Sequence, residues 1–182
     1  MDDPAQAWLG RSLDDGDVTP DDVVLRYLRA FGPATVADVQ AWSGLTRLRE
    51  VTSRLGDRLR RFEDDLGSEL LDVADGLLPD QDTPAPVRFL PPFDNAILAH
   101  ADRTRIVTPE LRRVVSRDRL MRTFLVDGFV AGTWHINGGA LDIRPFRPLG
   151  KHEREAVGAE GERLVEFVLP DATARRVEIS PV

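Results

Sequence analysis

Arginine supplies nearly all the positive charge of this 182-residue chain, in which Lys151 is the only lysine. The planar guanidinium group of arginine can donate two parallel hydrogen bonds to one phosphate, which the ammonium group of lysine does not do. Phosphate binding is therefore the first chemistry that the sequence suggests. A GC-rich genome would produce the same arginine bias without any binding surface.

The arginines gather in two stretches of the chain. Residues 46–62 carry six arginines against two acids, and residues 102–122 carry seven arginines against three acids. Because guanidinium groups donate well to phosphate oxygens, both stretches are candidate surfaces for contact with phosphate. The candidate contacts are Arg47, Arg54 and Arg58 in the first stretch and Arg103 and Arg105 in the second.

Trp134 and His135 lie side by side on a predicted hairpin and complete the set of candidate DNA contacts. The histidine suits a phosphate contact only when its ring is protonated. The alternative interpretation is that His135 packs on the hairpin or faces solvent.

The helix predicted from about residue 46 has one apolar face and one face of mixed charge. The arginines Arg47, Arg54 and Arg58 line one flank of the apolar stripe. The outward face carries acids as well, and the spacing of four residues favours the ion pairs Glu50–Arg54 and Asp57–Arg61. No side-chain set on this face is typical of base readout. A solvated helix face is therefore the alternative to a DNA-contacting one.

We find no catalytic or metal-binding pattern and expect no cofactor. The chain has no cysteine and three histidines, none of them in a metal-ligand spacing. His100 and Asp102 are half of a metal site that no neighbouring residue completes. Asp94 and Asp102 bracket an apolar stretch and can form a pair of carboxylates, although such acids more often cap helices or pair with arginine.

Composition indicates an ordinary globular protein, with 42% hydrophobic and 30% charged residues. No apolar run is long enough to span a membrane, and the acidic start lacks the features of a signal peptide. We therefore expect no membrane partner and a cytoplasmic location. The net charge of −7 argues against non-specific binding of nucleic acid, which usually requires a basic surface.

The first half of the chain predicts three helices followed by a hairpin, which is the order of a winged helix. Thr19-Pro20 and Thr35 have the residue types that begin helices, Gly32-Pro33 ends the first, and Gly44 ends the second. Strands are expected at 59–63 and 69–73.

The second half predicts a three-stranded meander, a helix and a short last strand. Asp127-Gly128 and Asn137-Gly138 are hairpin turns between strands at 123–127, 129–136 and 140–146. We expect the helix at 151–167 and the last strand at 176–179. The fold class is α+β, and the predicted organisation is a linker or tail (1–18), a winged helix (19–80), a proline-rich connector (81–92) and a small, barrel-like α+β domain (93–182).

Four stretches of the chain together resemble one bacterial family of winged-helix DNA-binding proteins, which includes DNA glycosylases that act on interstrand crosslinks and alkylated bases. The stretches are LRYLRAFGPATVADVQAWSGL, RFLPPFDNAILAHADRTRI, TFLVDGFVAGTWHI and EGERLVEFV. The resemblance covers about residues 8–170 and corresponds to the C-terminal half of family members. It implies winged helices and a β-barrel that hold duplex DNA.

This chain departs from the family pattern in two respects. The family's catalytic motif, a glutamine and an apolar residue followed by glutamine or aspartate, lies in the N-terminal half, and Gln40-Ala41-Trp42 does not reproduce it. His135 stands where many relatives have arginine. The resemblance therefore implies DNA docking without catalysis in this chain.

Two functions follow from these patterns. The first is a non-catalytic DNA-docking part of a glycosylase-like protein. The second is a protein–protein module that packs on an N-terminal half or on a second copy of the chain, for which the negative charge and Glu50 and Asp57 argue. A complete glycosylase would need a catalytic pair within the chain, and Asp94 is the first residue to mutate in testing that.

Overall fold

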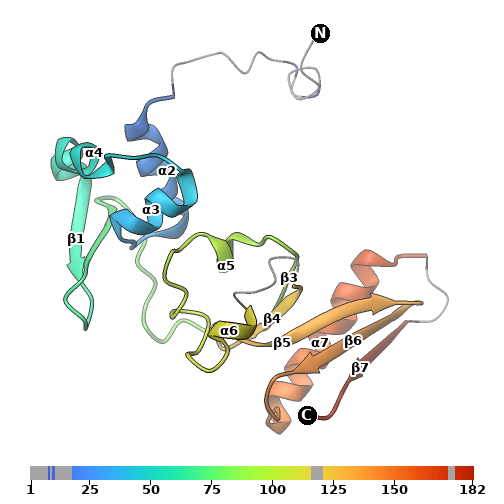
Figure 1. Cartoon of the computed structure of the whole chain (residues 1–182). Helices are drawn as coiled ribbons and strands as arrows, with labels where there is room; N and C mark the ends of the chain where they lie inside the picture. The colour runs from blue at the N-terminus through green and yellow to red at the C-terminus, as the bar shows by residue number, and fades with distance from the viewer. Residues whose placement is uncertain (1–7, 9, 11–17, 116–120, 172–174) are drawn as a thin grey trace. The chain divides into compact units, whose positions relative to one another are not determined.

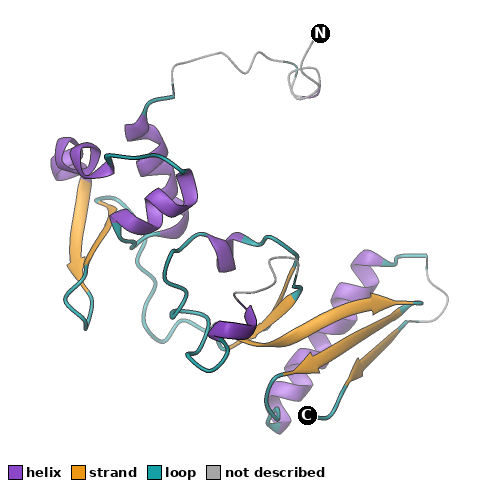
Figure 2. Ribbon diagram, viewed as in Figure 1, coloured by secondary structure: helices purple, strands orange, loops and turns teal. Residues whose placement is uncertain are grey.

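The computed structural model describes residues 8, 10, 18–115, 121–171 and 175–182 (Figures 1 and 2). The chain divides into two compact units, which we call unit 1 (residues 1–77) and unit 2 (residues 78–182). Unit 1 contains, in chain order, α2 (Pro20–Phe31), α3 (Val36–Ser43), α4 (Leu48–Leu55), the 3₁₀ turn η1 (Gly56–Arg58), β1 (Leu59–Glu63) and β2 (Glu69–Val73).

Helices α2 and α3 both begin with a reciprocal threonine–aspartate cap. The Thr19 hydroxyl accepts the Asp22 backbone N–H at 3.3 Å, and the Thr19 backbone N–H donates to the Asp22 carboxylate at 3.0 Å. Thr35 and Asp38 repeat this exchange at 3.1 and 2.8 Å. Each cap satisfies backbone groups that a helix start leaves unpaired. The helix starts predicted at Thr19 and Thr35 are confirmed.

Helix α4 begins later than its predicted start near residue 46. Arg47 lies in the left-handed region with φ of 62°, so the helical backbone cannot extend past it and the helix begins at Leu48. Leu48, Val51 and Leu55 are buried, as the apolar periodicity predicts.

The hairpin of unit 1 packs against its helices. β1 and β2 pair antiparallel with Leu59 opposite Val73, and the predicted strand bounds are confirmed. Ala34, between α2 and α3, exchanges two backbone hydrogen bonds of 2.9 and 2.8 Å with Leu71 of β2. Because Ala34 and Leu71 are fully buried, this bridge ties the turn between the helices to the hairpin.

Unit 2 is a five-stranded sheet with helices beside it. Its elements are β3 (Arg88–Leu90), α5 (Asn95–Leu98), α6 (Arg112–Val115), β4 (Thr123–Val126), β5 (Phe129–Asn137), β6 (Ala140–Pro145), α7 (Lys151–Val168) and β7 (Arg176–Ile179). The strand order is β3-β4-β5-β6-β7, with every neighbouring pair antiparallel except β6 and β7, which are parallel across α7. The predicted meander, its helix and the last strand are confirmed.

The described sheet is open, and this corrects the barrel-like expectation. β3 and β7 are its two edges, and no described pairing joins them. β3 also falls inside the proline-rich segment 81–92 that we expected to be a connector, where it pairs with β4. Short strands are hard to predict from sequence when prolines flank them. Proline has no backbone N–H to pair with a neighbouring strand, so a proline-rich segment is usually interpreted as a loop.

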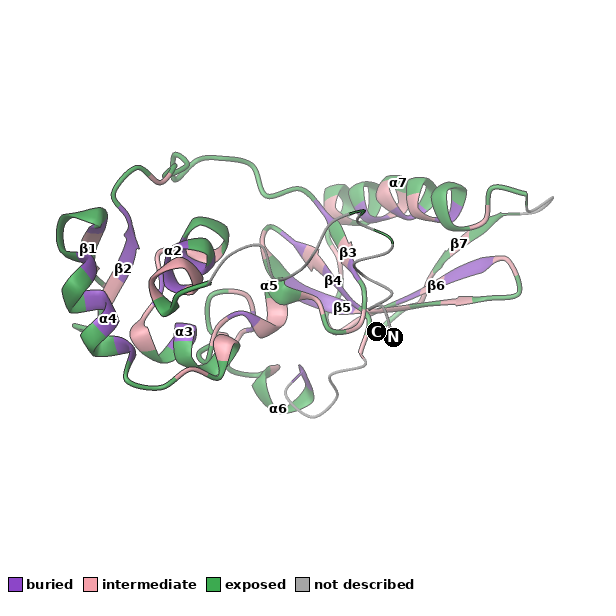
Figure 3. Cartoon of the chain, turned by 90° about the horizontal axis from the view of Figure 1, so that it is seen from above, coloured by how far each residue is buried: buried purple, intermediate pink, exposed green. Residues whose placement is uncertain are grey.

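The core of unit 2 lies between the sheet and α7, whose buried and exposed residues alternate in Figure 3. Gly161 permits the closest approach of the helix to the sheet, because a Cβ built there would lie 3.0 Å from Val177 and 3.1 Å from Leu141. Val157 and Val165, on either side of Gly161, are buried against the same strands. A second, smaller cluster joins α6 to β5 through Val115 and Val130.

Candidate nucleic-acid interface

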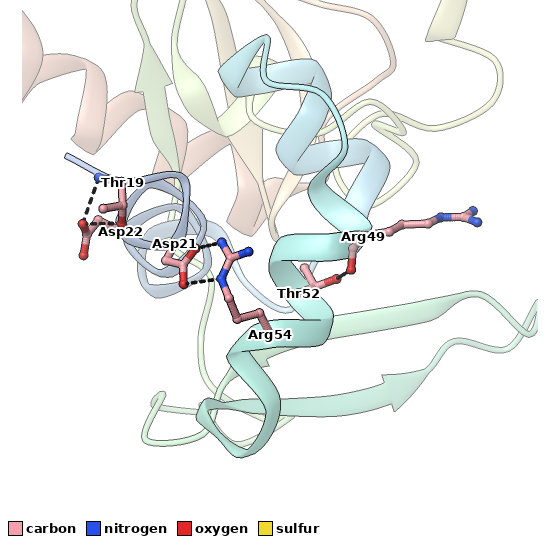
Figure 4. A network of polar contacts seen from close by, with 6 residues as sticks. All are labelled: Thr19, Asp21, Asp22, Arg49, Thr52 and Arg54. Carbon is pink, nitrogen blue, oxygen red and sulfur yellow. Dashed lines mark hydrogen bonds and ion pairs between the residues drawn. The ribbon is translucent and has the colours of Figure 1, made fainter. Parts of the chain in front are cut away.

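Helix α4 presents two flanks on either side of its buried face. Arg54 lies on the first flank and points toward α2, whereas Arg49 points to the opposite side of the helix (Figure 4). We call these the α2-facing flank, which carries Arg47, Arg54 and then Arg58 beyond the helix end, and the hairpin-facing flank, which carries Arg49, Thr52 and Ser53. At about 100° per residue the two sets lie on opposite edges of the apolar stripe.

The α2-facing flank is neutralised by acids. Arg54 Nε donates to Asp21 Oδ2 of α2 at 3.2 Å, and a second guanidinium nitrogen pairs with Oδ1. The hydrogen bond from Arg54 lowers the pKa of Asp21, and the same bond raises the pKa of Arg54. The helix-surface pair Glu50–Arg54 expected from sequence is therefore wrong, because Arg54 reaches an acid on a neighbouring helix instead.

Arg47 and Arg58 also have acidic surroundings. Arg47 donates to Glu50 at 3.1 Å within the first turn of α4. Arg58 has no ion pair with another described residue, but its charge contributes to the lowered pKa of Asp21 and of Asp22, after the hydrogen bonds that those acids accept. The three arginines predicted on unit 1 thus lie together on one flank, and acids of α2 and α4 offset their charge.

The hairpin-facing flank borders a groove of about 550 Å³ that sequence reasoning missed. The groove runs between the start of α3, one side of α4 and the β1–β2 hairpin. Its lining is polar except for two small apolar residues, and consists of Thr35, Val36, Ala37, Arg49, Thr52, Ser53, Arg61, Ser68 and Glu69.

Arg49 and Arg61 are the two cations of this groove. Within the described part of the chain, no ion pair is found for Arg49, and its side chain extends away from α2. Arg61 pairs with Glu69 on the adjacent strand, with both side chains about half exposed. The predicted pair Asp57–Arg61 is therefore wrong, since Arg61 belongs to β1 and faces across the hairpin rather than along a helix.

The candidates in unit 2 fall at two separate places. Arg103 and Arg105 lie in the loop between α5 and α6, where Arg103 is half-buried and Arg105 is exposed. Trp134 and His135 lie on β5 and, as neighbours on a strand, point to opposite faces.

Trp134 has a packing role in the structure. Its indole N–H donates to the backbone carbonyls of Leu90 at 3.0 Å and Thr123 at 3.1 Å, which ties β3 to β4. Its ring packs edge-on against Phe89, with 5.9 Å between ring centroids. His135 is exposed on the other face of the strand, opposite Asp142 of β6. Trp134 is half-buried, and His135 is the more exposed of the two side chains.

The carboxylates singled out from sequence have structural partners. Asp94 caps α5 by accepting the Ala96 backbone N–H at 2.7 Å. Asp102 accepts the Thr104 backbone N–H at 3.0 Å and lies 3.6 Å from the Arg112 guanidinium. A cavity beside Asp94 and Arg103 has a volume of about 10 Å³, room for about one water molecule. The described residues contain no group of three His, Asp or Glu side chains that could hold a metal ion.

None of the described helices has both the length and the apolar character that crossing a bilayer requires.

Comparison with known proteins identifies the relatives of this chain. The family model described as "DNA glycosylase AlkZ-like" matches residues 3–167. The interstrand DNA cross-link repair glycosylase of Streptomyces sahachiroi is 31% identical over 143 residues, a match that covers 68% of this chain and 36% of the relative. The solved structure of the DNA glycosylase AlkZ from the same organism superposes with a TM-score of 0.72 at 25% identity, over 93% of this chain and 49% of AlkZ.

This chain therefore spans about half the length of the relatives that it matches, or less. The family match covers most of both units, and the structural match extends over nearly the whole chain. The mixed α+β architecture agrees with that of the solved relative. The chain belongs to the family of AlkZ-like DNA glycosylases.

Proposed function

We propose that this chain is the DNA-docking part of an AlkZ-like DNA-repair protein and that unit 1 acts as a winged helix on duplex DNA. The observation that carries the proposal is the family match over residues 3–167, since the matched relatives are named as DNA glycosylases. The predicted contacts Arg47, Arg54, Arg58, Arg103, Arg105, Trp134 and His135 remain proposals of this function.

Base excision itself is assigned to another part of the protein or to a partner chain. A glycosylase must take a flipped nucleotide into a pocket and place a polar group beside it. The two carboxylates considered for that role, Asp94 and Asp102, cap a helix and pair with arginine. The cavity beside Asp94 has room for about one water molecule and is far too small for a base.

The test is a titration of a fluorescein-labelled duplex, two to three helical turns long, with fluorescence anisotropy as the readout. We expect binding at about 50 mM salt that weakens at least tenfold at about 200 mM salt, because phosphate contacts release counterions. A chain that fails to bind the duplex at the lower salt concentration would contradict the proposed function.

A second function, a protein–protein module, is favoured by a different observation. Phe167 at the end of α7 and Leu66 at the hairpin tip are 84% and 90% exposed, and unit 1 offsets three of its arginines with acids. Exposed apolar side chains indicate a protein interface where they lie together, and Phe167 is followed on α7 by Val168, which is 43% exposed. Sedimentation of the chain distinguishes the two functions: a dimer that dissociates on Phe167→Asp substitution supports the module, and a monomer that binds duplex supports docking.

A further inference from the structure

We propose that the groove between the hairpin-facing flank of α4 and the β1–β2 hairpin binds the phosphate backbone of duplex DNA, with Arg49 as its principal cation. This inference rests on the proposed DNA docking and specifies which surface of unit 1 performs it. It places the principal contact on the opposite side of α4 from the predicted contacts Arg47, Arg54 and Arg58.

The first step of the argument concerns charge. An arginine that already pairs with a carboxylate must lose that partner when it contacts phosphate, so its net gain is small. On the α2-facing flank, Arg54 donates to Asp21 and Arg47 donates to Glu50. Both arginines therefore lose part of the favourable energy of a phosphate contact. Arg49 has no ion pair among the described residues and therefore meets a phosphate without that cost.

The second step concerns the shape and chemistry of the groove. The groove of about 550 Å³ is open to solvent, so a phosphate backbone can lie along it without entering a closed pocket. Ser53 on α4 and Ser68 on the hairpin bring hydroxyl groups to its lining. Hydroxyls and guanidinium groups are among the usual donors to phosphate oxygens, and they carry no base specificity.

The third step concerns the acid within the groove. Glu69 is the only carboxylate of the lining, and in the free protein it pairs with Arg61. Because Arg61 already pairs with Glu69, it meets the same cost as Arg47 and Arg54 and contributes less than Arg49 to a phosphate contact. The negative charge of Glu69 thus repels the phosphate group that Arg49 attracts. Removal of the two charges should change affinity in opposite directions.

The first turn of α3 adds a smaller contribution. Val36 and Ala37, whose backbone begins that helix, line the groove. The positive end of the helix dipole therefore faces the same space as Arg49 and favours an anion there. Arg49 and the groove lining carry the proposal, and the helix start only strengthens the local potential.

The experiment compares single variants of the whole chain in the duplex titration at about 50 mM salt. Arg49→Ala should weaken binding about tenfold and lower the slope of log affinity against log salt by about one, for every duplex sequence. Arg26→Ala and Arg163→Ala are matched controls, since each removes one positive charge from an exposed helical position outside the predicted contacts, and each should weaken binding less than about twofold. Circular dichroism melting checks that every variant folds.

Glu69→Gln supplies a test of opposite sign, because it should strengthen binding about twofold to threefold. Equal losses for Arg49→Ala and the two controls would show that only net charge matters and would overturn the groove assignment, while the proposed docking would stand. Unchanged binding in Arg49→Ala would overturn it as well. A wild-type chain that does not bind duplex would overturn both proposals together.

Discussion

The two units are stabilised in different ways. Unit 1 has short helices whose starts are fixed by polar caps, and a backbone bridge between Ala34 and Leu71 joins its helices to the hairpin. Unit 2 depends on close apolar contact between one long helix and a sheet, with Gly161 at the tightest point. The difference indicates that unit 1 tolerates changes of surface charge, whereas unit 2 is sensitive to small changes of volume.

The largest expected effect is a steric one in unit 2. Gly161→Leu should lower the free energy of unfolding of unit 2 by about 3 kcal/mol, because side-chain atoms have no space between α7 and β7. Gly158→Ala is the matched control on the same helix, where a new Cβ meets no atom within 4 Å. It should raise stability by about 0.5–1 kcal/mol through helix propensity. Urea denaturation of each variant measures both, and equal effects would contradict the tight contact.

The next effect separates packing from DNA contact at Trp134. Trp134→Phe keeps an aromatic ring but removes the N–H that donates to Leu90 and Thr123. Two buried carbonyls lose a donor, so unit 2 should lose about 1–2 kcal/mol of stability. Affinity for duplex should stay within about twofold of wild type in the folded variant. A large loss of affinity without a loss of stability would indicate that Trp134 contacts DNA directly.

His135→Ala provides the contrast on the same strand. The side chain is exposed, so the melting temperature should stay within about 1–2 °C of wild type. Any role that His135 has at a DNA surface would then appear in binding alone.

A smaller effect comes from the start of α7. Hydrogen bonds from Arg147, and then from the Gly150 backbone N–H, lower the pKa of Glu153 to about 2 from 4.5. The folded pKa is depressed, so this stabilisation is complete above pH 4.5 and is lost as the pH falls toward 2. Glu153→Gln should cost unit 2 less than about 1 kcal/mol at neutral pH, because the pair is partly exposed. The difference from wild type should vanish near pH 2 in acid melts; a difference that persists there would contradict the assignment.

The smallest effect is expected on unit 1. Asp21→Asn removes the carboxylate that holds Arg54 and reduces the net negative charge by one. Affinity for duplex should rise less than about twofold at low salt, because Arg54 lies on the flank away from the groove. A rise as large as the loss caused by Arg49→Ala would show that the α2-facing flank binds DNA after all.

Local patterns made much of the fold predictable. Thr19, Thr35 and the turns Asp127-Gly128 and Asn137-Gly138 act on backbone groups within a few residues, so their types alone indicate where elements begin and reverse. The element order of both units and the strand bounds of unit 1 followed from such signals.

Contacts between distant elements were not predictable from the same patterns. A helical wheel identifies both flanks of α4, but only the folded chain shows that α2 brings Asp21 to one of them and the hairpin forms a groove along the other. The sequence pattern of α4 therefore does not show which of Arg49 and Arg54 has an acid beside it. The hydrogen bonds of the Trp134 indole were likewise not predictable, because the carbonyls that it binds come from residues 11 and 44 positions away.

The open sheet of unit 2 also has a consequence for solubility. Each edge strand presents unpaired backbone groups that could pair with a strand of another molecule and start aggregation. The edge β7 carries Arg176 and Glu178 at its exposed positions, and β3 has only three residues and begins with Arg88. A strand that paired with either edge would have to place its side chains beside these charged residues. The charged edges therefore protect a sheet that lacks the closure of a barrel from joining the sheets of its neighbours.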